Sequence, residues 1–371
     1  MSGFAFHVRA QDGKARLGRM RTPHGEVVTP AFMPVGTAGA VKAVTPEELR
    51  RCGAQLVLCN TYHLYLRPGH EVVRELGGLH RFMHWDGPIL TDSGGYQVFS
   101  MASLRELDDG GVRFRSHLDG SVHLLTPEKS MEIQAALGSD MAMVLDECPA
   151  LPATRHVVAE AVRRTTLWAE RCRESYRGPG VVFGIVQGGN YPDLRERSAR
   201  ELVDLGFPGY AVGGVSVGET AGEMMQAAAR TADHLPEDRP RYLMGVGRPQ
   251  DLVQAVASGM DLFDCVMPTR NARNGTLFTS CGKINIKQQR YLKDSRPLDE
   301  NCYCEVCRHY SRAYLRHLFL SREILASRFN TIHNLTYYLG LMARMRESIA
   351  QGRFATFLGG FQTEEVEGTR A

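Results

Sequence analysis

The chain has 371 residues, 43% of them hydrophobic, so it can bury a large core, and this length is normal for an α/β barrel with an appendage. Its net charge of +3, from 44 Lys+Arg against 41 Asp+Glu, is too small to indicate a nucleic-acid binder without a local concentration of charge. No apolar run approaches the length of a membrane span, so we expect no membrane association.

The N-terminal segment and the cysteines indicate the compartment. Residues 1–18, MSGFAFHVRAQDGKARLG, are interrupted by charges and lack both an apolar core and a small-residue cleavage site, so we expect no signal peptide. Nine cysteines, an odd number without an export signal, fit a reducing compartment in which thiols serve packing or metal binding. These observations predict a cytoplasmic protein.

Short apolar runs recur along the chain, and each stops at a polar or glycine-rich segment. Continuous apolar runs of this length are typical of strands that are buried on both faces. In chain order the runs are AQLVLCNTYH, GPILTDSGGYQ, MAMVLDECP, VVFGIVQGG, GYAVGGVSVGE, RYLMGVG and MDLFDCVMP.

Segments with helical periodicity lie between these runs. TPEELRRCG offers Thr45 as N-cap, Pro46 at the first helical position, Glu48 for a capping box and Gly53 just past the end. The Thr-Pro-Glu start recurs in TPEKSMEIQAALG, and amphipathic helices are predicted over 154–175, 191–206 and 249–260.

Strand and helix therefore alternate through about residue 265, which predicts a parallel sheet with covering helices. Seven or so units favour a closed (β/α)8 barrel. An open doubly wound sheet is the alternative because sheet order is not visible in sequence, although no G-x-G-x-x-G opens a helix after the first strand.

After residue 270 the pattern becomes basic, then cysteine-containing, then helical. Between residues 266 and 334 twelve Lys+Arg stand against five Asp+Glu, which indicates either a solvated face or a nucleic-acid surface. We predict a barrel over 1–275, a zinc-binding subdomain over 276–340, and a C-terminal helix closing the barrel with a loose tail over 341–371.

The segment NCYCEVC sets Cys302, Cys304 and Cys307 close together, and TIHN brings His333 after 25 intervening positions. Three thiolates and one imidazole complete a tetrahedral shell, the composition of a structural zinc site without an open position. Clustered cysteines can also be ordinary core residues. The alternative imidazoles are His309 and His317.

In a barrel, the residues just after each strand project from the C-terminal face, where barrel active sites are built. This predicts one mouth that contains Asp92, Asp146, Glu147, Gln187, Gly213, Gly214 and Asp264. A single aspartate of this kind is often a helix N-cap or turn residue. Several together suit glycosidic-bond chemistry, with one carboxylate as nucleophile and one as proton donor and acceptor.

Taken together, these motifs resemble the queuine tRNA-ribosyltransferase family, also called tRNA-guanine transglycosylase. The similarity runs from about Phe6 to Ile349. Its motifs are FMPVGT, TYHL, DSGGYQVFS, LDECP, FGIVQGG, YAVGGVSVGE, LMGVG, FDCVMPTRNARNGTLFT and the three cysteines with His333. The resemblance implies an irregular (β/α)8 TIM barrel with a small zinc subdomain near the C-terminus, and a homodimer in the bacterial form.

The resemblance also implies the reaction and its two catalytic residues. The family exchanges guanine at the wobble position of certain tRNA anticodons for a 7-deazaguanine base. By motif match, Asp264 attacks the ribose anomeric carbon and holds the RNA covalently, and Asp92 is the general acid and base.

Base-binding roles transfer in the same way. Asp146 would accept hydrogen bonds from guanine N1–H and the exocyclic amino group, and Tyr96 would stack on the base. The resemblance also implies that Gln187 and the backbone of Gly214 and Val215 read the O6 side. Two further substrate-binding positions in the match are Val217 and Met244.

RNA contacts and zinc complete the implied site. Arg270 and Arg273 would hold nucleotides that flank the target in a single-stranded anticodon loop. The zinc would be structural, one ion per chain. A carbohydrate or nucleoside hydrolase and a noncatalytic RNA-binding subunit are the competing functions, although the presence of both Asp92 and Asp264 argues against the second.

The resemblance separates bacterial members, which insert the precursor 7-aminomethyl-7-deazaguanine (preQ1), from eukaryotic members, which insert queuine. Eukaryotic members commonly have glycine at the position of Val217, where the valine side chain would fill the space that the queuine ring needs. Tyr96 and Cys148 match the bacterial pattern, while Ser216 is closer to the eukaryotic form. We therefore expect preQ1 to be the inserted base.

Overall fold

The computed structural model describes residues 3–101 and 105–368 of the chain. Its centre is a parallel sheet in the order β4-β15-β14-β13-β12-β11-β7-β6-β5. These strands are β4 (Ala31–Met33), β5 (Val35–Gly36), β6 (Val57–Cys59), β7 (Ile89–Thr91), β11 (Met141–Met143), β12 (Val181–Val186), β13 (Tyr210–Val212), β14 (Arg241–Leu243) and β15 (Leu262–Asp264).

The sheet closes into a barrel at its first strand. Only Pro34 separates β4 from β5, and the two pieces pair with opposite ends of the sheet, β4 with β15 and β5 with β6. They are two halves of one strand, since the proline cannot donate a ladder hydrogen bond and interrupts the assignment. The predicted irregular (β/α)8 barrel is confirmed, and the open doubly wound sheet is excluded.

Helices follow the strands, as the alternation predicted. Thr45 and Glu48 form the expected capping box on α1, and Gly53 ends it at φ 94°. The barrel helices are α1 (Pro46–Cys52), α2 (Thr61–Leu66), α3 (His70–Glu75), α4 (Gly78–Met83), α5 (Gly95–Met101), α6 (Pro127–Leu137), α7 (Arg155–Ser175), α8 (Pro192–Leu205), α9 (Ala221–Ala232) and α10 (Pro249–Ala257).

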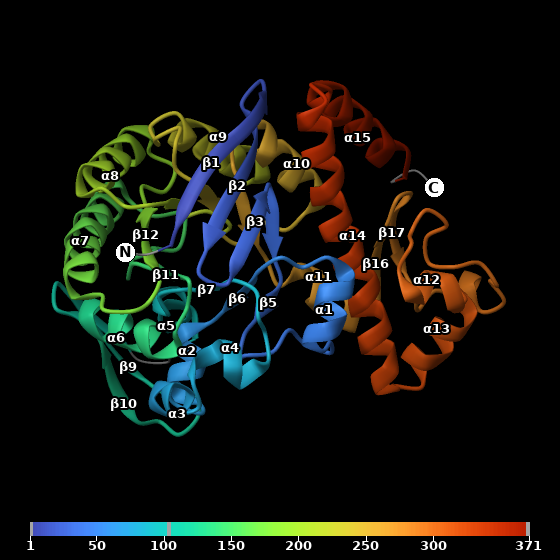
Figure 1. The fold of residues 1–371 in the computed structure, drawn as a ribbon, viewed down its shortest axis with the longest axis horizontal. Helices are drawn as coiled ribbons and strands as arrows, with labels where there is room; N and C mark the ends of the chain where they lie inside the picture. The colour runs from blue at the N-terminus through green and yellow to red at the C-terminus, as the bar shows by residue number, and fades with distance from the viewer. Residues whose placement is uncertain (1–2, 102–104, 369–371) are drawn as a thin grey trace.

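Two antiparallel sheets decorate the barrel, and neither was predicted. The sheet of β1 (Ala5–Asp12), β2 (Ala15–Thr22) and β3 (Gly25–Thr29) covers the N-terminal ends of the barrel strands and lies in front of the barrel in Figure 1. The second, β8 (Arg105–Asp108), β9 (Gly111–Arg115) and β10 (Val122–Leu125), is inserted between α5 and α6. Charged and polar residues interrupt their strands, so these strands contain no continuous apolar run.

The cysteine-containing segment is an insertion in the last strand–helix unit. After β15 come α11 (Met267–Arg273), β16 (Thr276–Thr279), β17 (Gly282–Asn285), the 3₁₀ turn η1 (Gln289–Tyr291), α12 (Glu305–His309) and α13 (Arg312–Leu320). The chain then returns as α14 (Ile324–Ala350), which packs against α1, α10 and α11 as the eighth barrel helix. Figure 1 shows β16, β17, α12 and α13 on the outer side of α14. One helix therefore belongs to both the subdomain and the barrel.

The predicted loose tail is wrong for most of its length. Helix α15 (Phe354–Gly368) continues through FQTEEVEG, and residues 369–371 lie outside the described part of the chain. This stretch contains no proline, and its Gln and Glu residues are strong helix formers, so the helix continues to a glycine. No helix in the described residues is long and apolar enough to cross a membrane.

Candidate active site

The structure brings the predicted mouth residues to one end of the barrel. Asp92 follows β7, Asp146 follows β11, Gln187 follows β12, and Asp264 is the last residue of β15. Because the strands are parallel, these positions share the C-terminal face. Burial is the main cause that raises the pKa of Asp92 and of Asp146, and the carboxylates are close enough to add to it: Asp264 raises the pKa of Asp92, and Asp92 raises that of Asp146.

Asp264 has one oxygen held and one oxygen free. Its Oδ1 accepts hydrogen bonds from the Tyr242 hydroxyl at 2.5 Å and from the Gly245 N–H at 2.8 Å. Within the described residues Oδ2 has no hydrogen-bond partner, and Asp264 takes part in no ion pair. Burial in the surrounding protein raises its pKa. A fixed carboxylate with one unpaired oxygen is suited to nucleophilic attack.

Asp92 is held at both oxygens. The N–H of Thr61 donates to Oδ1 at 2.8 Å, and the side-chain amides of Asn60 and Gln97 donate to Oδ2, the second at 2.8 Å. Burial raises the pKa of Asp92 to about 6, against the lowering effect of these hydrogen bonds. A carboxyl group that changes protonation near neutral pH is suited to general acid and base catalysis.

Asp146 and Gln187 form a hydrogen-bonded pair. Gln187 Nε2 donates to Asp146 Oδ2 at 2.7 Å, and the Ser93 hydroxyl donates to Oδ1 at 3.3 Å. Burial raises the pKa of Asp146 to about 6. Gln187 Oε1 is buried without a partner among the described residues. Glu147 was predicted for the same mouth, but it forms an ion pair with Arg164 of α7. It is therefore not one of the mouth carboxylates without a cation partner.

The remaining predicted base-binding residues lie on the loops at this end. Gly214 and Val215 are buried after β13, and Val217 and Met244 are half-buried. Gly214 adopts φ 62°, and a Cβ there would overlap Gln187 Oε1, so both backbone conformation and space require glycine. Tyr96, on α5, is 52% exposed and leaves its ring available for stacking.

The two predicted RNA-binding arginines lie on α11, directly after the strand of Asp264. Arg270 is exposed, while Arg273 is half-buried and donates to the Thr269 carbonyl at 2.8 Å. Among the described residues neither forms an ion pair with Asp264. Arg270 and Arg273 therefore follow Asp264 closely along the chain without forming an ion pair with its carboxylate.

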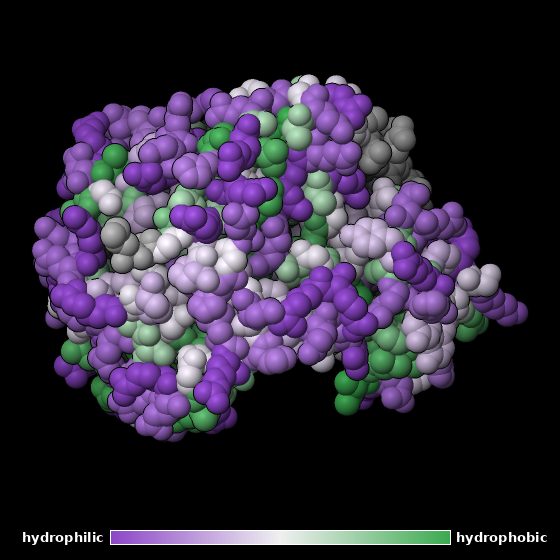
Figure 2. All heavy atoms as spheres, in the orientation of Figure 1, coloured by the Kyte–Doolittle hydropathy of each residue, from purple (hydrophilic) through white to green (hydrophobic). Residues whose placement is uncertain are grey.

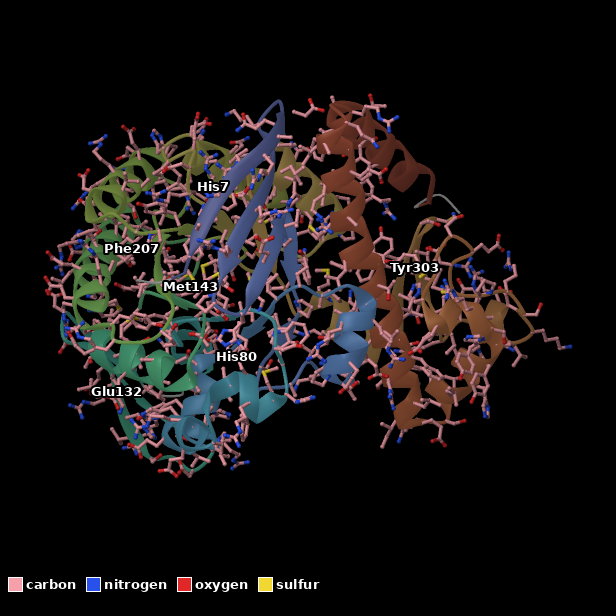
Figure 3. All side chains as sticks on the ribbon, in the orientation of Figure 1. His7, His80, Glu132, Met143, Phe207 and Tyr303 are labelled. Atoms are coloured by element: carbon pink, nitrogen blue, oxygen red, sulfur yellow. The ribbon has the colours of Figure 1, made fainter. Side chains whose placement is uncertain are left out.

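The four predicted metal ligands meet between the subdomain and α14. The Nδ1 atom of His333 lies 3.3 Å from the Cys307 sulfur and 3.8 Å from the Cys304 sulfur, and Cys302 completes the cluster. His333 Nε2 contacts the Phe278 carbonyl at 2.8 Å, which fixes the tautomer that turns Nδ1 toward the thiols. Tyr303, between two of the cysteines, marks this place beside α14 in Figure 3.

These donors fit a metal ion. All four ligand atoms lie within 4.8 Å of one another, and three sulfurs with one imidazole suit a tetrahedral soft-metal site. His309 and His317 are exposed and lie outside this cluster, whereas His333 lies within it.

The sequence analysis missed the residues that hold the carboxylates. Asn60 and Thr61 follow β6, Gln97 lies on α5, and Tyr242 lies on β14. The signal for Asn60 and Thr61 was their place at the end of an apolar run, the same signal that identified Asp92. No local signal pointed to Tyr242, because its hydroxyl reaches Asp264 across 22 positions of sequence.

A closed parallel barrel whose C-terminal mouth contains two buried carboxylates and one half-buried carboxylate, none with a cation partner among the described residues, defines an enzyme of the barrel class with acid–base or nucleophilic chemistry. The attached subdomain with its Cys3His cluster distinguishes this protein from barrel enzymes that have no such subdomain.

Comparison with known proteins also indicates an enzyme. The family model described as queuine tRNA-ribosyltransferase matches residues 11–366. Proteins named queuine tRNA-ribosyltransferase from Pelotomaculum thermopropionicum and Acidithiobacillus ferrooxidans are 55% and 56% identical, over 96% and 98% of this chain and 97% and 98% of their own. The one from Oleidesulfovibrio alaskensis is 57% identical over 95% of this chain and 94% of its own. The chain belongs to the queuine tRNA-ribosyltransferase family of enzymes.

Proposed function

We propose that the protein exchanges guanine at the wobble position, 34, of tRNAs with GUN anticodons for preQ1, a step of queuosine biosynthesis. The observation that carries the proposal is the different hydrogen bonding of the Asp264 and Asp92 carboxylates at the mouth. Asp264 has a free oxygen, whereas both oxygens of Asp92 are held by donors. This difference is suited to Asp264 as the nucleophile and Asp92 as the residue that gives and takes the proton.

The exchange takes two steps. Asp264 Oδ2 forms a bond to ribose C1′ as the bond from C1′ to guanine N9 breaks, and Asp92 gives its proton to the departing guanine. The incoming base then loses a proton to Asp92 and attacks C1′, which releases the Asp264 carboxylate. Two inversions retain the stereochemistry, and no water is consumed.

Base recognition rests on the pair of Asp146 and Gln187. Asp146 accepts from N1–H and the exocyclic amino group of guanine, a pattern that adenine lacks. Gln187 with the backbone of Gly214 and Val215 donates to O6, and Tyr96 stacks on the ring. A wrong base that leaves one such buried group unpaired loses about 1 to 3 kcal/mol.

The RNA enters as a single-stranded anticodon loop, because the target base has to leave its neighbours to reach the mouth. Arg270 and Arg273 contact the flanking nucleotides, and the basic subdomain contacts phosphates. The partners are therefore tRNA, guanine and preQ1.

The metal is one structural zinc ion per chain, held by Cys302, Cys304, Cys307 and His333. Zinc supplies folding free energy there and takes no part in the exchange. We expect about one zinc per chain by metal analysis. A zinc content that stays unchanged in Cys304→Ser would contradict the ligand set.

The assembly is a homodimer in the cytoplasm. Figure 2 shows a recess between barrel and subdomain, with hydrophobic side chains gathered on the subdomain side where α13 ends and α14 begins. Leu320 and Ile324, at this junction, are 51% and 86% exposed. A second copy would cover such side chains.

The test of the exchange is incorporation of labelled guanine into tRNA, which separates exchange from hydrolysis, together with an RNA–protein adduct on denaturing gels. Loss of guanine from tRNA without incorporation of a new base would indicate the hydrolase instead, and no reaction at all would favour a noncatalytic RNA-binding subunit.

The choice of base is tested by competition between preQ1 and queuine. We expect preQ1 to be used and queuine to be much poorer, because overpacking at Val217 costs about 1 to 3 kcal/mol. Val217→Gly should admit queuine. Equal use of both bases by the unmodified enzyme would refute Val217 as the determinant.

A further inference from the structure

A buried arginine lies behind the proposed base-binding loop. Arg195, on α8, is only 2% exposed, and within the described residues it forms no ion pair. Its guanidinium donates instead to three backbone carbonyls, those of Gly189 at 2.7 Å, Gly213 at 3.1 Å and Gly214 at 2.9 Å. Burying a guanidinium without a carboxylate partner is costly, so this arrangement calls for a reason beyond packing.

The surrounding glycines let the loops close on this side chain. Gly188 has φ 142°, and a Cβ there would lie 2.6 Å from Arg195 Cγ. A Cβ at Gly213 would lie 2.8 Å from Gln187 Nε2. The loops that follow β12 and β13 are thus joined through one guanidinium, with the Gln187 amide packed directly against them.

The guanidinium also sets the direction of two peptide N–H groups. In a trans peptide the C=O and the following N–H point in opposite directions. Since the carbonyls of Gly213 and Gly214 face Arg195, the N–H groups of Gly214 and Val215 face away from it. The Gly214 N–H is directed to the sulfur of Cys148, which also contacts Gln187.

The Val215 N–H is an unused donor. No acceptor for it exists among the described residues, although Val215 is only 7% exposed. The unpartnered Oε1 of Gln187 lies against the same loop. A buried peptide donor of this kind needs a partner, and a ligand carbonyl can supply it.

We infer that Arg195 is a positioning residue for base recognition. It fixes the two peptides after β13 so that the Val215 N–H presents a donor to the 6-oxo group of a purine, while the Gly214 N–H stays directed to Cys148. Hydrogen bonds from the guanidinium to the two carbonyls also polarise these peptides and strengthen their N–H groups as donors. The inference rests on the proposed function, because it assumes that a 6-oxopurine occupies the mouth.

The experiment compares two competitors of labelled guanine in the exchange assay: guanine, which has the 6-oxo group, and 2-aminopurine, which lacks both this group and the N1–H. In the unmodified enzyme guanine should compete far better. Arg195→Met should weaken the binding of guanine about tenfold, which corresponds to the loss of one good hydrogen bond. The binding of 2-aminopurine should stay unchanged. General damage to the mouth would weaken both bases equally. The matched control is Arg197→Met, an exposed arginine of the same helix paired with Glu201.

The outcomes separate this inference from the proposed function. If the unmodified enzyme incorporates no guanine, the proposed function fails. If it does, and Arg195→Met keeps the preference of the unmodified enzyme for guanine or weakens both bases equally, the positioning role is wrong. Should Arg195→Met not fold, Arg195→Lys decides in the same assay, because lysine keeps the charge but cannot span three carbonyls.

Discussion

Strand β15 has an aspartate at each end, and the two carboxylates have different surroundings. Asp261, just before the strand, pairs with Arg16 of β2 and accepts the N–H of Arg241 at 2.7 Å. Asp264, three residues later, has no cation partner among the described residues and accepts only from Tyr242 and Gly245. Burial raises the pKa of both carboxyls.

The same contrast separates the two ends of the barrel. At the N-terminal end, Asp140 contacts His24 at 2.8 Å and His80 at 3.1 Å. At the C-terminal mouth, Asp92, Asp146 and Asp264 accept hydrogen bonds only from neutral donors among the described residues. Removing the partner of a paired buried carboxylate is destabilising, whereas a buried carboxylate without a charged partner lowers stability and is available for chemistry.

The largest expected effect comes from Asp264→Asn, which keeps the shape of the mouth and removes the nucleophile. Guanine exchange should fall by about 10⁴-fold or more, and no RNA adduct should form on denaturing gels. The melting temperature should stay equal or rise, because a buried unpaired charge is removed. An adduct that persists in this variant would show that another residue attacks the ribose.

Asp261→Asn is the matched change at the other end of the same strand. Leaving Arg16 buried without its partner should lower the free energy of unfolding by about 3 to 5 kcal/mol. Exchange per folded molecule should stay close to that of the unmodified enzyme. Urea unfolding and exchange below the unfolding midpoint measure the two quantities. An unchanged unfolding curve would show that the pair with Arg16 does not support the fold.

The effect of pH sharpens the comparison at the mouth. The pKa of Asp146 is raised to about 6, so its protonated form dominates below that pH and cannot accept from guanine N1–H. The KM for guanine should therefore rise as the pH falls below about 6. In Asp146→Asn the KM should be high and independent of pH. A KM that is flat between pH 5 and 7 in the unmodified enzyme would argue against Asp146 as the acceptor.

The contribution of Asp146 to the free energy of unfolding should increase as the pH falls, whereas guanine binding weakens. A folded-state pKa of about 6, above the ordinary value of 3.8, means that protonation favours the folded state. This contribution is fully present below the unfolded-state pKa and is lost as the pH rises through 6. The stability gain of Asp146→Asn over the unmodified enzyme should therefore grow from pH 4 to pH 7, by on the order of 2 to 3 kcal/mol.

The sequence predicted the mouth better than the opposite end of the barrel. Asp92 and Asp264 directly follow apolar runs, and that local signal, with the motif match, was enough to place them. Asp261 directly precedes such a run, but its partner Arg16 is 245 positions away. No local pattern shows which buried carboxylate will find a cation at that distance.

The subdomain shows the same limit. Spacing and residue type identified the three cysteines and His333, because metal ligands are defined by chemistry. The role of α14 as both the helix that carries His333 and the eighth barrel helix could not be predicted, since it depends on packing against α1 and α10. Arg195 was missed for a related reason: an arginine on an amphipathic helix is usually exposed.

The smallest expected effect concerns Asp140, the histidine-paired carboxylate. Its imidazole partners are stacked, with ring centroids 3.5 Å apart and planes at 16°. His80, labelled in Figure 3, lies on α4, and His24 lies in the turn between β2 and β3. Burial opposes ionisation of Asp140, but hydrogen bonds from His80, the Ile89 N–H and His24 lower its pKa overall.

These three side chains are close enough to hold a metal, but the stacking argues against it. The lone pair of an imidazole lies in the ring plane, so two nearly parallel rings direct their nitrogens along parallel lines, toward the two oxygens of one carboxylate rather than to one ion. We therefore expect His80→Ala and His24→Ala to leave the zinc content unchanged. Each variant should lose about 1.5 kcal/mol of stability, the low end of the range for a hydrogen bond to a charged group. His80→Ala should lose more, because the His80 side chain is 14% exposed and that of His24 is 38% exposed, so water replaces the second more easily. Urea unfolding with metal analysis of both variants tests this, and a loss of bound metal in either would show that the stack opens to form a second metal site.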